Sequence, residues 1–419
     1  MNRYATLLIL LGGGCLLLGG CRQKPIGTIM DEIPPPPPEY DRPLPAGELA
    51  LVKITDPAQM PDIAAACSDV SGLKQAVVNS LHFMAKRSSR RFFPYGDITH
   101  EQAVASLQAF AEMLDSGLSG PQLDAAIRAH FDVYTSVGWD GSGTVLFTGY
   151  YTPIFDGSLT KTDRFHHPLY TEPKAMVKTE DGTVLGLRGA DGSMEKCPPR
   201  KDLEQSGRLA GTELVYLADP FDAYVAHVQG SAQLRLPDGK MVTVGYAANN
   251  GHEYVSIGKE LVREGKIAAG RLNLQTMMDY FRANPQDTYE YTWRNPRYVF
   301  FAFNEGAPRG SLNEPVTPMR TIATDKAIFP RASLAMVVTE LPRSYYGAVQ
   351  MILYTGFAVD QDTGGAIRAA GRCDLYMGIG PDAGQLAGFT QKEGRLYYLF
   401  LKPSGETPSA LPPVGSGAE

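Results

Sequence analysis

Cysteine is scarce in this chain, and so is any large excess of charge of one sign. Five cysteines occur in 419 residues and no Cys-x-x-Cys pair is present, which excludes a dense disulfide framework and a cysteine-based metal site. Lys and Arg total 39 against 45 for Asp and Glu, so the formal net charge is -6. A negative chain has no general attraction for nucleic acid, and we expect no nucleic-acid partner.

Several motifs of metal and nucleotide chemistry are also missing. His252-Glu253 begins like a zinc-binding HExxH helix, but Ser256 stands where the second histidine ligand is needed. The chain has no GxSxG nucleophile elbow and no GxxxxGK(S/T) phosphate loop, and the glycines from Gly378 to Gly384 miss the GxGxxG spacing. We therefore expect no metal and no cofactor.

The composition itself is typical of globular proteins. Hydrophobic residues make up 43%, aromatic residues 10% and charged residues 20%, so most of the chain should fold. At about 100–200 residues per domain, the length predicts two or three domains. The chain contains 44 glycines and 31 prolines without a collagen-like period, which favours a β-rich fold with many turns.

The first 20 residues have the pattern of a secretion signal. Arg3 is their only charged side chain, apolar runs follow, and the segment leads into Leu18-Gly19-Gly20-Cys21. This sequence resembles the lipobox of bacterial lipoproteins, in which the cysteine carries two acyl chains that anchor the mature protein. The alternative, an uncleaved membrane helix, needs about 20 apolar residues, and five glycines interrupt this stretch. Arg22, in place of aspartate, favours the outer membrane, with the protein facing the periplasm.

Residues 21–48 would then form the lipid anchor and a spacer. Ile33–Glu39 contains five consecutive prolines, which predict a semi-rigid polyproline II segment, with a ligand for a proline-binding partner as the alternative. Residues 404–419 are rich in Pro, Gly and Ser and predict a disordered tail. At most one disulfide can form from the cysteines that remain after signal cleavage and lipidation. These are Cys67, Cys197 and Cys373.

Hydrophobic periodicity divides the chain between helices and strands, and Pro237-Asp238-Gly239 predicts a hairpin. Helical spacing with terminal capping residues predicts helices at residues 73–86, 99–114, 123–131, 257–264 and 272–283. Short apolar or alternating runs predict strands at residues 144–147, 214–217, 221–228, 232–236, 241–244, 298–303, 334–339, 349–355, 366–368 and 395–401. The fold class is therefore mainly β with a helical N-terminal segment, an α+β arrangement.

The remaining candidates for chemistry are aspartates near glycine-rich turns. Asp362 lies in the corner Asp360–Ile367, Asp374 follows the turn at Gly371, and Asp325 lies earlier, just before a predicted strand. Glycines let the backbone approach a ligand closely, but Asp is also a common turn residue that caps its own backbone amides. The spacing alone leaves both roles open.

Longer motifs connect these aspartates to a known family. Phe147–Pro153 reads FTGYYTP, and the agreement continues through Val228–Ser231, Gly245–Ala247, Asn250–Tyr254, Ser256–Lys259, Asn295-Pro296, Tyr298–Phe301, Asp362–Ile367, Asp374–Tyr376, Gly378–Gly384 and Ala387-Gly388. In order and spacing these motifs, over roughly residues 145–402, are similar to those of the membrane-bound lytic murein transglycosylase A family.

The resemblance implies a fold of two domains. A double-psi β-barrel domain with the N-terminal helices would be built from residues 49–153 and 312–403. A second, small β-barrel domain would be inserted at residues 154–311, and the glycan would lie in the groove between the two domains.

The resemblance also implies an enzyme that cleaves the β-1,4 bond between N-acetylmuramic acid and N-acetylglucosamine in peptidoglycan. Glycan strands would be its partner, the lipid would attach it to the outer membrane, and cell-wall synthesis or division proteins are further candidate partners. By motif, Asp325, Asp362 and Asp374 match the three family aspartates, and Asp374 matches the catalytic one. The positions matched to the groove are Thr148, Gly149, Tyr150, Tyr151, Gln229 and Ser231.

One carboxyl group is enough for this reaction. Hydrolysing glycosidases usually need two, but here the C6 hydroxyl of muramic acid attacks C1, so Asp374 can donate a proton to the leaving oxygen and then accept one from that hydroxyl. An unperturbed aspartate titrates near ~3.9, so the charges of Asp362 and Asp325 and closure of the groove must raise its pKa. For Asp325, a structural role in binding turn amides is an equal alternative.

The groove residues each have a structural as well as a binding interpretation. Strand alternation sends Tyr150 and Tyr151 to opposite sides, so we expect one to stack on a sugar and the other to lie in the core. Gln229 and Ser231 would share one strand face, suited to hydrogen bonds with the glycan or simply solvated. For the whole protein, a non-catalytic peptidoglycan-binding scaffold lipoprotein and a hydrolase on the same scaffold are the competing functions.

Overall fold

The computed structural model describes residues 38–179, 184–345 and 348–403. The predicted signal peptide, the lipidation site Cys21, most of the proline-rich spacer and the predicted tail at residues 404–419 lie outside these ranges. Within the described ranges, no helix has the length and apolar character needed to cross a bilayer.

The helices agree with the hydrophobic pattern of the sequence. The α-helices of the described residues are α1 (Ile63–Ala66), α2 (Leu73–Met84), α3 (His100–Asp115), α4 (Gly120–His130), α5 (Arg200–Gln205), α6 (Pro220–Gln229), α7 (Ile257–Arg263), α8 (Leu274–Ala283), α9 (Thr288–Thr292) and α10 (Pro381–Phe389). Short 3₁₀ turns are η1 (Pro57–Gln59), η2 (Arg87–Phe92), η3 (Ala269–Arg271) and η4 (Pro285–Asp287). The five predicted helices are confirmed as α2, α3, α4, α7 and α8. Thr99 caps α3, because its side chain accepts a hydrogen bond from the amide of Gln102.

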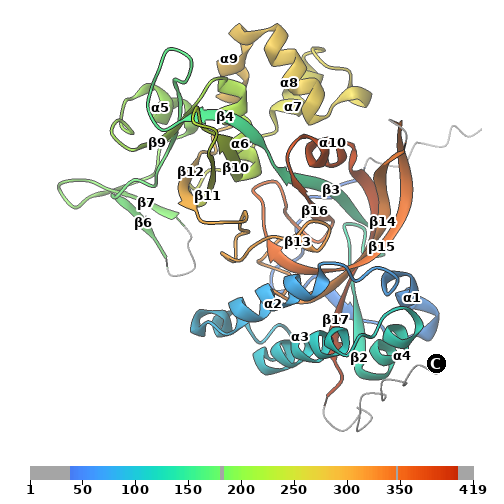
Figure 1. The fold of residues 1–419 in the computed structure, drawn as a ribbon. Helices are drawn as coiled ribbons and strands as arrows, with labels where there is room; N and C mark the ends of the chain where they lie inside the picture. The colour runs from blue at the N-terminus through green and yellow to red at the C-terminus, as the bar shows by residue number, and fades with distance from the viewer. Residues whose placement is uncertain (1–37, 180–183, 346–347, 404–419) are drawn as a thin grey trace, which may run out of the picture. The chain divides into compact units, whose positions relative to one another are not determined.

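The strands are more numerous and extend further than the predicted runs. They are β1 (Leu51–Lys53), β2 (Phe131–Ser136), β3 (Val145–Thr152), β4 (Ile154–Ser158), β5 (His167–Tyr170), β6 (Met176–Lys178), β7 (Val184–Arg188), β8 (Met194–Glu195), β9 (Glu213–Leu217), β10 (Ser231–Arg235), β11 (Met241–Asn249), β12 (Val299–Asn304), β13 (Thr321–Ala323), β14 (Leu334–Tyr345), β15 (Ala348–Asp362), β16 (Arg372–Ile379) and β17 (Gln391–Leu401). The chain is mainly β with a helical N-terminal segment, α1 to α4, as predicted, and α5 to α10 follow later in the chain (Figure 1).

Six strands close into a barrel in the order β17-β14-β15-β13-β16-β3, because β3 also pairs with β17. Two neighbouring pairs are parallel, β13 with β15 and β16 with β3, and the other barrel pairs are antiparallel. β2 pairs with β17 outside this ring and β1 pairs with β2. The barrel therefore joins one early strand, β3, to five strands from the C-terminal part of the chain.

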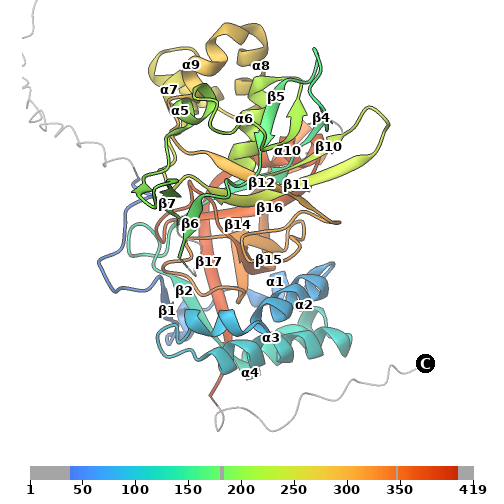
Figure 2. The ribbon, with the colours of Figure 1, turned by 90° about the vertical axis from the view of Figure 1, so that its left-hand side faces the viewer.

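The barrel is filled by apolar side chains and covered by the N-terminal helices. Phe147, Met336 and Leu375 are fully buried in its core. Helix α3 contacts β17 and α2 contacts β15, and both ribbon views show α1 to α4 grouped beside β2 and β17 (Figures 1 and 2). The rings of Phe110 in α3 and Phe357 in β15 meet edge to face with centroids 5.2 Å apart, which ties this helical layer to the barrel.

The segment between β3 and β13 forms its own sheets. A six-stranded sheet has the order β12-β11-β10-β4-β9-β5, and its two end strands contact each other. A three-stranded sheet, β6-β7-β8, accompanies it. The predicted hairpin is confirmed, since β10 and β11 pair antiparallel across the Pro237-Asp238-Gly239 turn. Leu234, Val244 and Phe301 belong to a core separate from that of the barrel.

Two strand predictions are wrong. Residues 221–228 form helix α6, because Asp219 caps its first turn and Pro220 occupies the first helical position. Residues 366–368 form no strand, since the chain turns there and Ala369 adopts a positive φ of 64°. In both places an apolar run suggested a strand, and local capping or turn geometry decided otherwise.

Candidate active site

Asp362 and Asp374 lie on two strands that flank β13. Asp362 ends β15, Asp374 lies near the start of β16, and each pairs in register with Ala323 of β13, from opposite sides. The pairing of β13 with β15 is irregular between Ile322 and Ala323, and the charge of Asp362 acts on Asp374 across β13. Two strand spacings put the Cα atoms of the two aspartates about 10 Å apart. Thr148 of β3 pairs with Asp374 on its other side.

Asp374 is half-buried and is held by a hydroxyl group. Thr148 Oγ1 donates a hydrogen bond to Asp374 Oδ1. Burial raises the pKa of Asp374 above its usual value and the charge of Asp362 raises it further, while Arg372 and the Thr148 hydrogen bond oppose the rise. No ion pair to Asp374 is present within the described ranges, because Arg372 pairs with Asp41 instead, at 3.2 Å. The carboxyl group of Asp374 is therefore biased toward its protonated form.

Asp362 is fixed by the backbone. Its Oδ1 accepts hydrogen bonds from the amides of Ser311 and Thr363, each at 2.8 Å. Burial raises the pKa of Asp362, and these two amides oppose the rise because they favour the ionised form. The carboxyl group is thus held in one orientation beside Asp374.

Asp325 has a structural role in its turn. Its Oδ1 accepts a hydrogen bond from the amide of Ala327 at 3.0 Å, and its Oδ2 accepts one from the amide of Ala369 at 3.0 Å. Ala369 is the residue with positive φ before β16, so Asp325 fastens the turn that leads to Asp374. Of the two roles left open by the sequence, the turn-binding one is therefore present.

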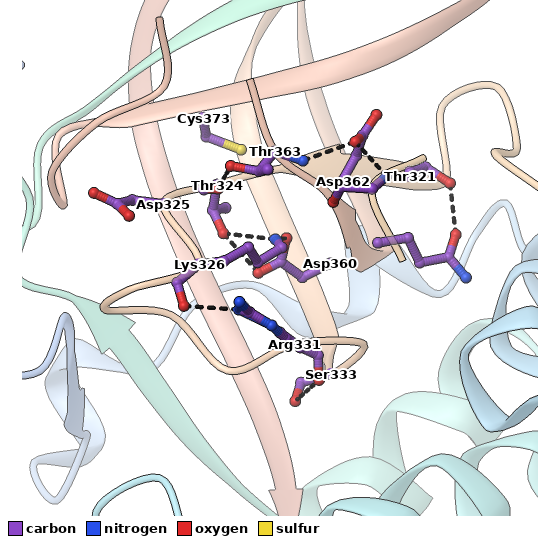
Figure 3. A network of polar contacts seen from close by, with 12 residues as sticks. Thr321, Thr324, Asp325, Lys326, Arg331, Ser333, Asp360, Asp362, Thr363 and Cys373 are labelled. Carbon is purple, nitrogen blue, oxygen red and sulfur yellow. Dashed lines mark hydrogen bonds and ion pairs between the residues drawn. The ribbon is translucent and has the colours of Figure 1, made fainter. Parts of the chain in front are cut away.

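A buried ion pair, which the sequence did not indicate, lies near Asp325 and Asp362 (Figure 3). Lys326 Nζ bonds to Asp360 Oδ1, while Thr324 Oγ1 and the hydroxyl of Tyr398 each donate to Asp360 Oδ2 at 2.7 Å. Asp360 is fully buried and the side chain of Lys326 is only 7% exposed. Burial lowers the pKa of Lys326, and the charge of Asp360 opposes this. The pair joins the turn that contains Asp325 to the strand that ends at Asp362.

Tyr150 and Tyr151 point to opposite sides of β3, as alternation predicts. The ring centroid of Tyr150 lies 5.1 Å from that of Tyr376, on the face that carries Asp374, and its buried hydroxyl faces the carboxyl group of Asp362. Burial raises the pKa of Tyr150, and the charge of Asp362 raises it further. Tyr151 is 6% exposed and packs against Gly384 of α10.

Gly149 contacts helix α10 and not the face of Asp374. A Cβ atom at this position would lie 2.7 Å from the backbone Cα of Ala387. We expect the Gly149→Ala variant to lose roughly 1–3 kcal/mol of unfolding free energy, because the strand and helix backbones would have to separate. Urea unfolding measures this loss. Gly388→Ala is the matched control, since nothing lies within 4 Å of its Cβ position in α10. A Gly149→Ala variant as stable as this control would contradict the packing role.

Gln229 and Ser231 do not share a strand face, which corrects the prediction. Gln229 ends helix α6, Gly230 adopts a left-handed conformation, and Ser231 begins β10. The Oε1 atom of Gln229 accepts a hydrogen bond from the amide of Tyr151 at 3.1 Å. Ser231 is buried, and its hydroxyl lies 3.2 Å from that of Thr152. Both side chains therefore connect the segment after β3 to β3 itself.

Arg372 was missed by the sequence analysis. It lies two residues before Asp374 on the same strand face, donates to Thr148 Oγ1 at 3.4 Å, and has a buried Nε atom without a hydrogen-bond partner among the described residues. The signal available in the sequence was its position two residues before Asp374, which puts both side chains on one face of a strand. No cluster of three or more His, Cys, Asp or Glu side chains suited to a metal ion occurs in residues 38–179, 184–345 and 348–403.

Family models match both parts of the chain. The model described as the MltA specific insert domain matches residues 146–302, and the model described as the 3D domain matches residues 320–400. The membrane-bound lytic murein transglycosylase A of Vibrio cholerae is 33% identical over 303 residues, which cover 69% of this chain and 75% of the relative. The Escherichia coli protein of the same name is 28% identical over 278 residues, covering 65% and 70%.

Solved structures share the fold. The membrane-bound lytic murein transglycosylase from Agrobacterium tumefaciens superposes with a TM-score of 0.70 at 23% identity, covering 84% of this chain and 98% of that chain. Escherichia coli MltA with bound chitohexaose gives a TM-score of 0.62 at 24% identity, covering 87% and 96%. Together with the extent of the similarity to the Vibrio protein, these matches show that the chain is a peptidoglycan lytic transglycosylase and belongs to the membrane-bound lytic murein transglycosylase A family.

Proposed function

We propose that this enzyme cleaves the β-1,4 bond between N-acetylmuramic acid and N-acetylglucosamine with Asp374 as its single acid and base. The observation that carries the proposal is the half-buried Asp374 carboxyl group, whose pKa is raised by burial and by Asp362. A carboxylic acid must keep its proton near neutral pH to act as a general acid, and this environment favours that state.

The reaction needs two proton transfers at one group. Asp374 donates its proton to the leaving glycosidic oxygen as the bond to C1 breaks. The C6 hydroxyl of the muramic acid then attacks C1, and Asp374 accepts its proton, which gives a 1,6-anhydro ring and returns the acid to its starting state. A second carboxyl group that activates water is not required, unlike in hydrolases.

Three neighbours would support Asp374 in this cycle. Thr148 orients one carboxyl oxygen by its hydrogen bond, so the other oxygen is left for proton transfer. Asp362 raises the pKa of Asp374 before the transfer. Arg372 stabilises the carboxylate formed after the first transfer, because its positive charge lowers that pKa. We assign glycan contacts to Tyr150, which lies on the face of β3 that carries Asp374.

We propose glycan strands of peptidoglycan as the partner, and attachment to the outer membrane through a lipid on Cys21. A related MltA structure was solved with bound chitohexaose, an oligosaccharide, which supports a glycan as the ligand. The lipobox-like sequence before Cys21 supports the anchor.

Mass spectrometry of digested sacculi tests the reaction. We expect the purified enzyme to release muropeptides with 1,6-anhydro ends. Products with a reducing muramic acid, which are heavier by one water, would mean that water is the nucleophile and would overturn the proposal.

The pH dependence of the rate should report the pair of aspartates. Activity falls as the pH rises through the pKa of Asp374, because the proton donor is lost. The Asp362→Asn variant removes a negative neighbour, so the pKa of Asp374 falls and the alkaline limb of the profile moves to lower pH. Initial rates from about pH 4 to 9 measure the shift, because this range begins near the ordinary aspartate pKa of about 3.9 and extends above it, where a raised pKa lies. An unmoved alkaline limb would show that Asp362 does not tune Asp374.

A further inference from the structure

A hollow lies on the other side of β3 from Asp374. Tyr150 faces the aspartates, whereas the next residue, Tyr151, points to the opposite side and lines this hollow. Helix α8 and helix α10 contribute to its walls, so we call it the α8–α10 cleft. The cleft is separate from the site of bond cleavage, because β3 stands between them.

The α8–α10 cleft has the size and lining of a ligand site. Its volume is about 530 Å³, within the range of roughly 300–1,000 Å³ that small-molecule sites occupy. Ile154 and Phe155 of β4 and Met278 of α8 give it an apolar wall. Such a wall favours a ligand with apolar atoms over a simple inorganic anion.

The lining of this cleft contains three arginines against two aspartates, although the chain as a whole carries a net charge of -6. Three arginines line it: Arg164, Arg235 and Arg282. Arg164 and Arg235 share a single carboxylate, that of Asp156, at 2.9 and 3.6 Å. Arg282 lies 3.6 Å from Asp279, and more than half of its side chain is exposed. The guanidinium groups thus have N–H donors that are not used by these aspartates and can bind a further carboxylate.

Asp222, in the first turn of α6, is the remaining acidic group of the cleft lining. Burial raises the pKa of Asp222 to about 7, Asp219 and Asp156 raise it as well, and Arg282 opposes them. Near neutral pH a fraction of Asp222 is protonated and can donate a hydrogen bond to an anion. This acid therefore opposes an anionic ligand less than a fully ionised aspartate would.

We propose that the α8–α10 cleft binds an acidic peptide, namely the stem peptide that peptidoglycan strands carry. Its carboxylates would lie against Arg235 and Arg282, and its apolar atoms against Phe155 and Met278. This inference rests on the proposed function in one respect, namely that peptidoglycan is the polymer that carries the peptide. The cleft would hold a stem while the glycan is cut on the other side of β3.

Calorimetry with the full chain tests the site without any chemistry. The probe is a synthetic stem tripeptide of L-alanine, D-glutamate and meso-diaminopimelate. We expect saturable binding to the wild type and equally to Asp374→Asn, and binding about tenfold weaker or more when Arg235→Gln and Arg282→Gln are combined. We also expect proton uptake, seen as a heat that depends on the buffer, because an anion beside Asp222 raises its pKa further. Asp222→Asn should bind without that dependence.

Several results would overturn the inference. The absence of binding to the folded wild type would do so, as would equal binding of the double arginine variant or of a tripeptide with amidated carboxylates. Tighter binding of an α-linked acidic tripeptide of ordinary amino acids would exclude the stem as the ligand. Activity on peptide-free glycan strands is measured separately, so failure of the peptide site leaves the proposed cleavage reaction untouched.

Discussion

The Asp374→Asn variant is expected to release no detectable 1,6-anhydromuropeptides from sacculi. An amide can neither donate the carboxyl proton to the leaving oxygen nor accept the proton of the C6 hydroxyl, and positioned proton transfer contributes about 10²–10⁴-fold to rates. Both transfers are lost together, so the decrease should lie at or beyond the upper end of that range. Mass spectrometry of the soluble products measures it.

The fold of this variant should remain intact. Asn can still accept the hydrogen bond from Thr148, and a neutral side chain avoids the cost that burial places on the ionised carboxyl group above its raised pKa. The thermal midpoint at neutral pH should therefore be no lower than that of the wild type. Asp382→Asn, an exposed aspartate in the first turn of α10, is the matched control and should retain full activity. Retained activity in Asp374→Asn would overturn its assignment as the acid.

Among the variants considered, Asp360→Asn is expected to lose the most unfolding free energy. It leaves the ammonium group of Lys326 buried without its counter-charge, and breaking a buried ion pair in this way costs about 3–5 kcal/mol. Chemical unfolding, followed by circular dichroism, measures the loss. Activity should fall with it, because the pair holds together the segments that carry Asp325 and Asp362.

Two further variants test whether the buried charge of Lys326 causes the loss of stability. Adding Lys326→Met to Asp360→Asn should recover part of the lost stability, since no lone charge is then buried. Glu340→Gln breaks the exposed pair with Lys392, at 3.2 Å, and should change stability by less than about 1 kcal/mol. A double variant less stable than Asp360→Asn alone would contradict the electrostatic explanation.

Much of the fold could be predicted from the sequence because its signals are local. Thr99 marks the start of α3, and the Asp238-Gly239 turn marks the hairpin between β10 and β11. The run from Phe221 to Val228 was wrongly predicted as a strand, because a buried helix with apolar residues on both faces has the same pattern. The capping residue Asp219 was the local signal that indicated a helix.

Site residues could be predicted from the sequence only where they lie in family motifs. Family motifs identified Asp362 and Asp374, and the strand pairing places them on either side of β13. The partner of Asp360 could not be predicted, because the contact with Lys326 depends on how a turn folds back on β15. Gly149 had no property in the sequence that distinguishes packing against a helix from binding a sugar.

The closure of the barrel also determines how the protein can assemble. The pairing of Gln391 with Thr148 joins strands separated by the whole insert, so loop-closure entropy opposes this contact more than any hairpin within the insert. During synthesis, β3 leaves the ribosome long before its partners and remains unpaired until β16 and β17 have been made. Chaperone protection of that exposed edge, and sensitivity to nonsense mutations that remove β17, follow from this order of events.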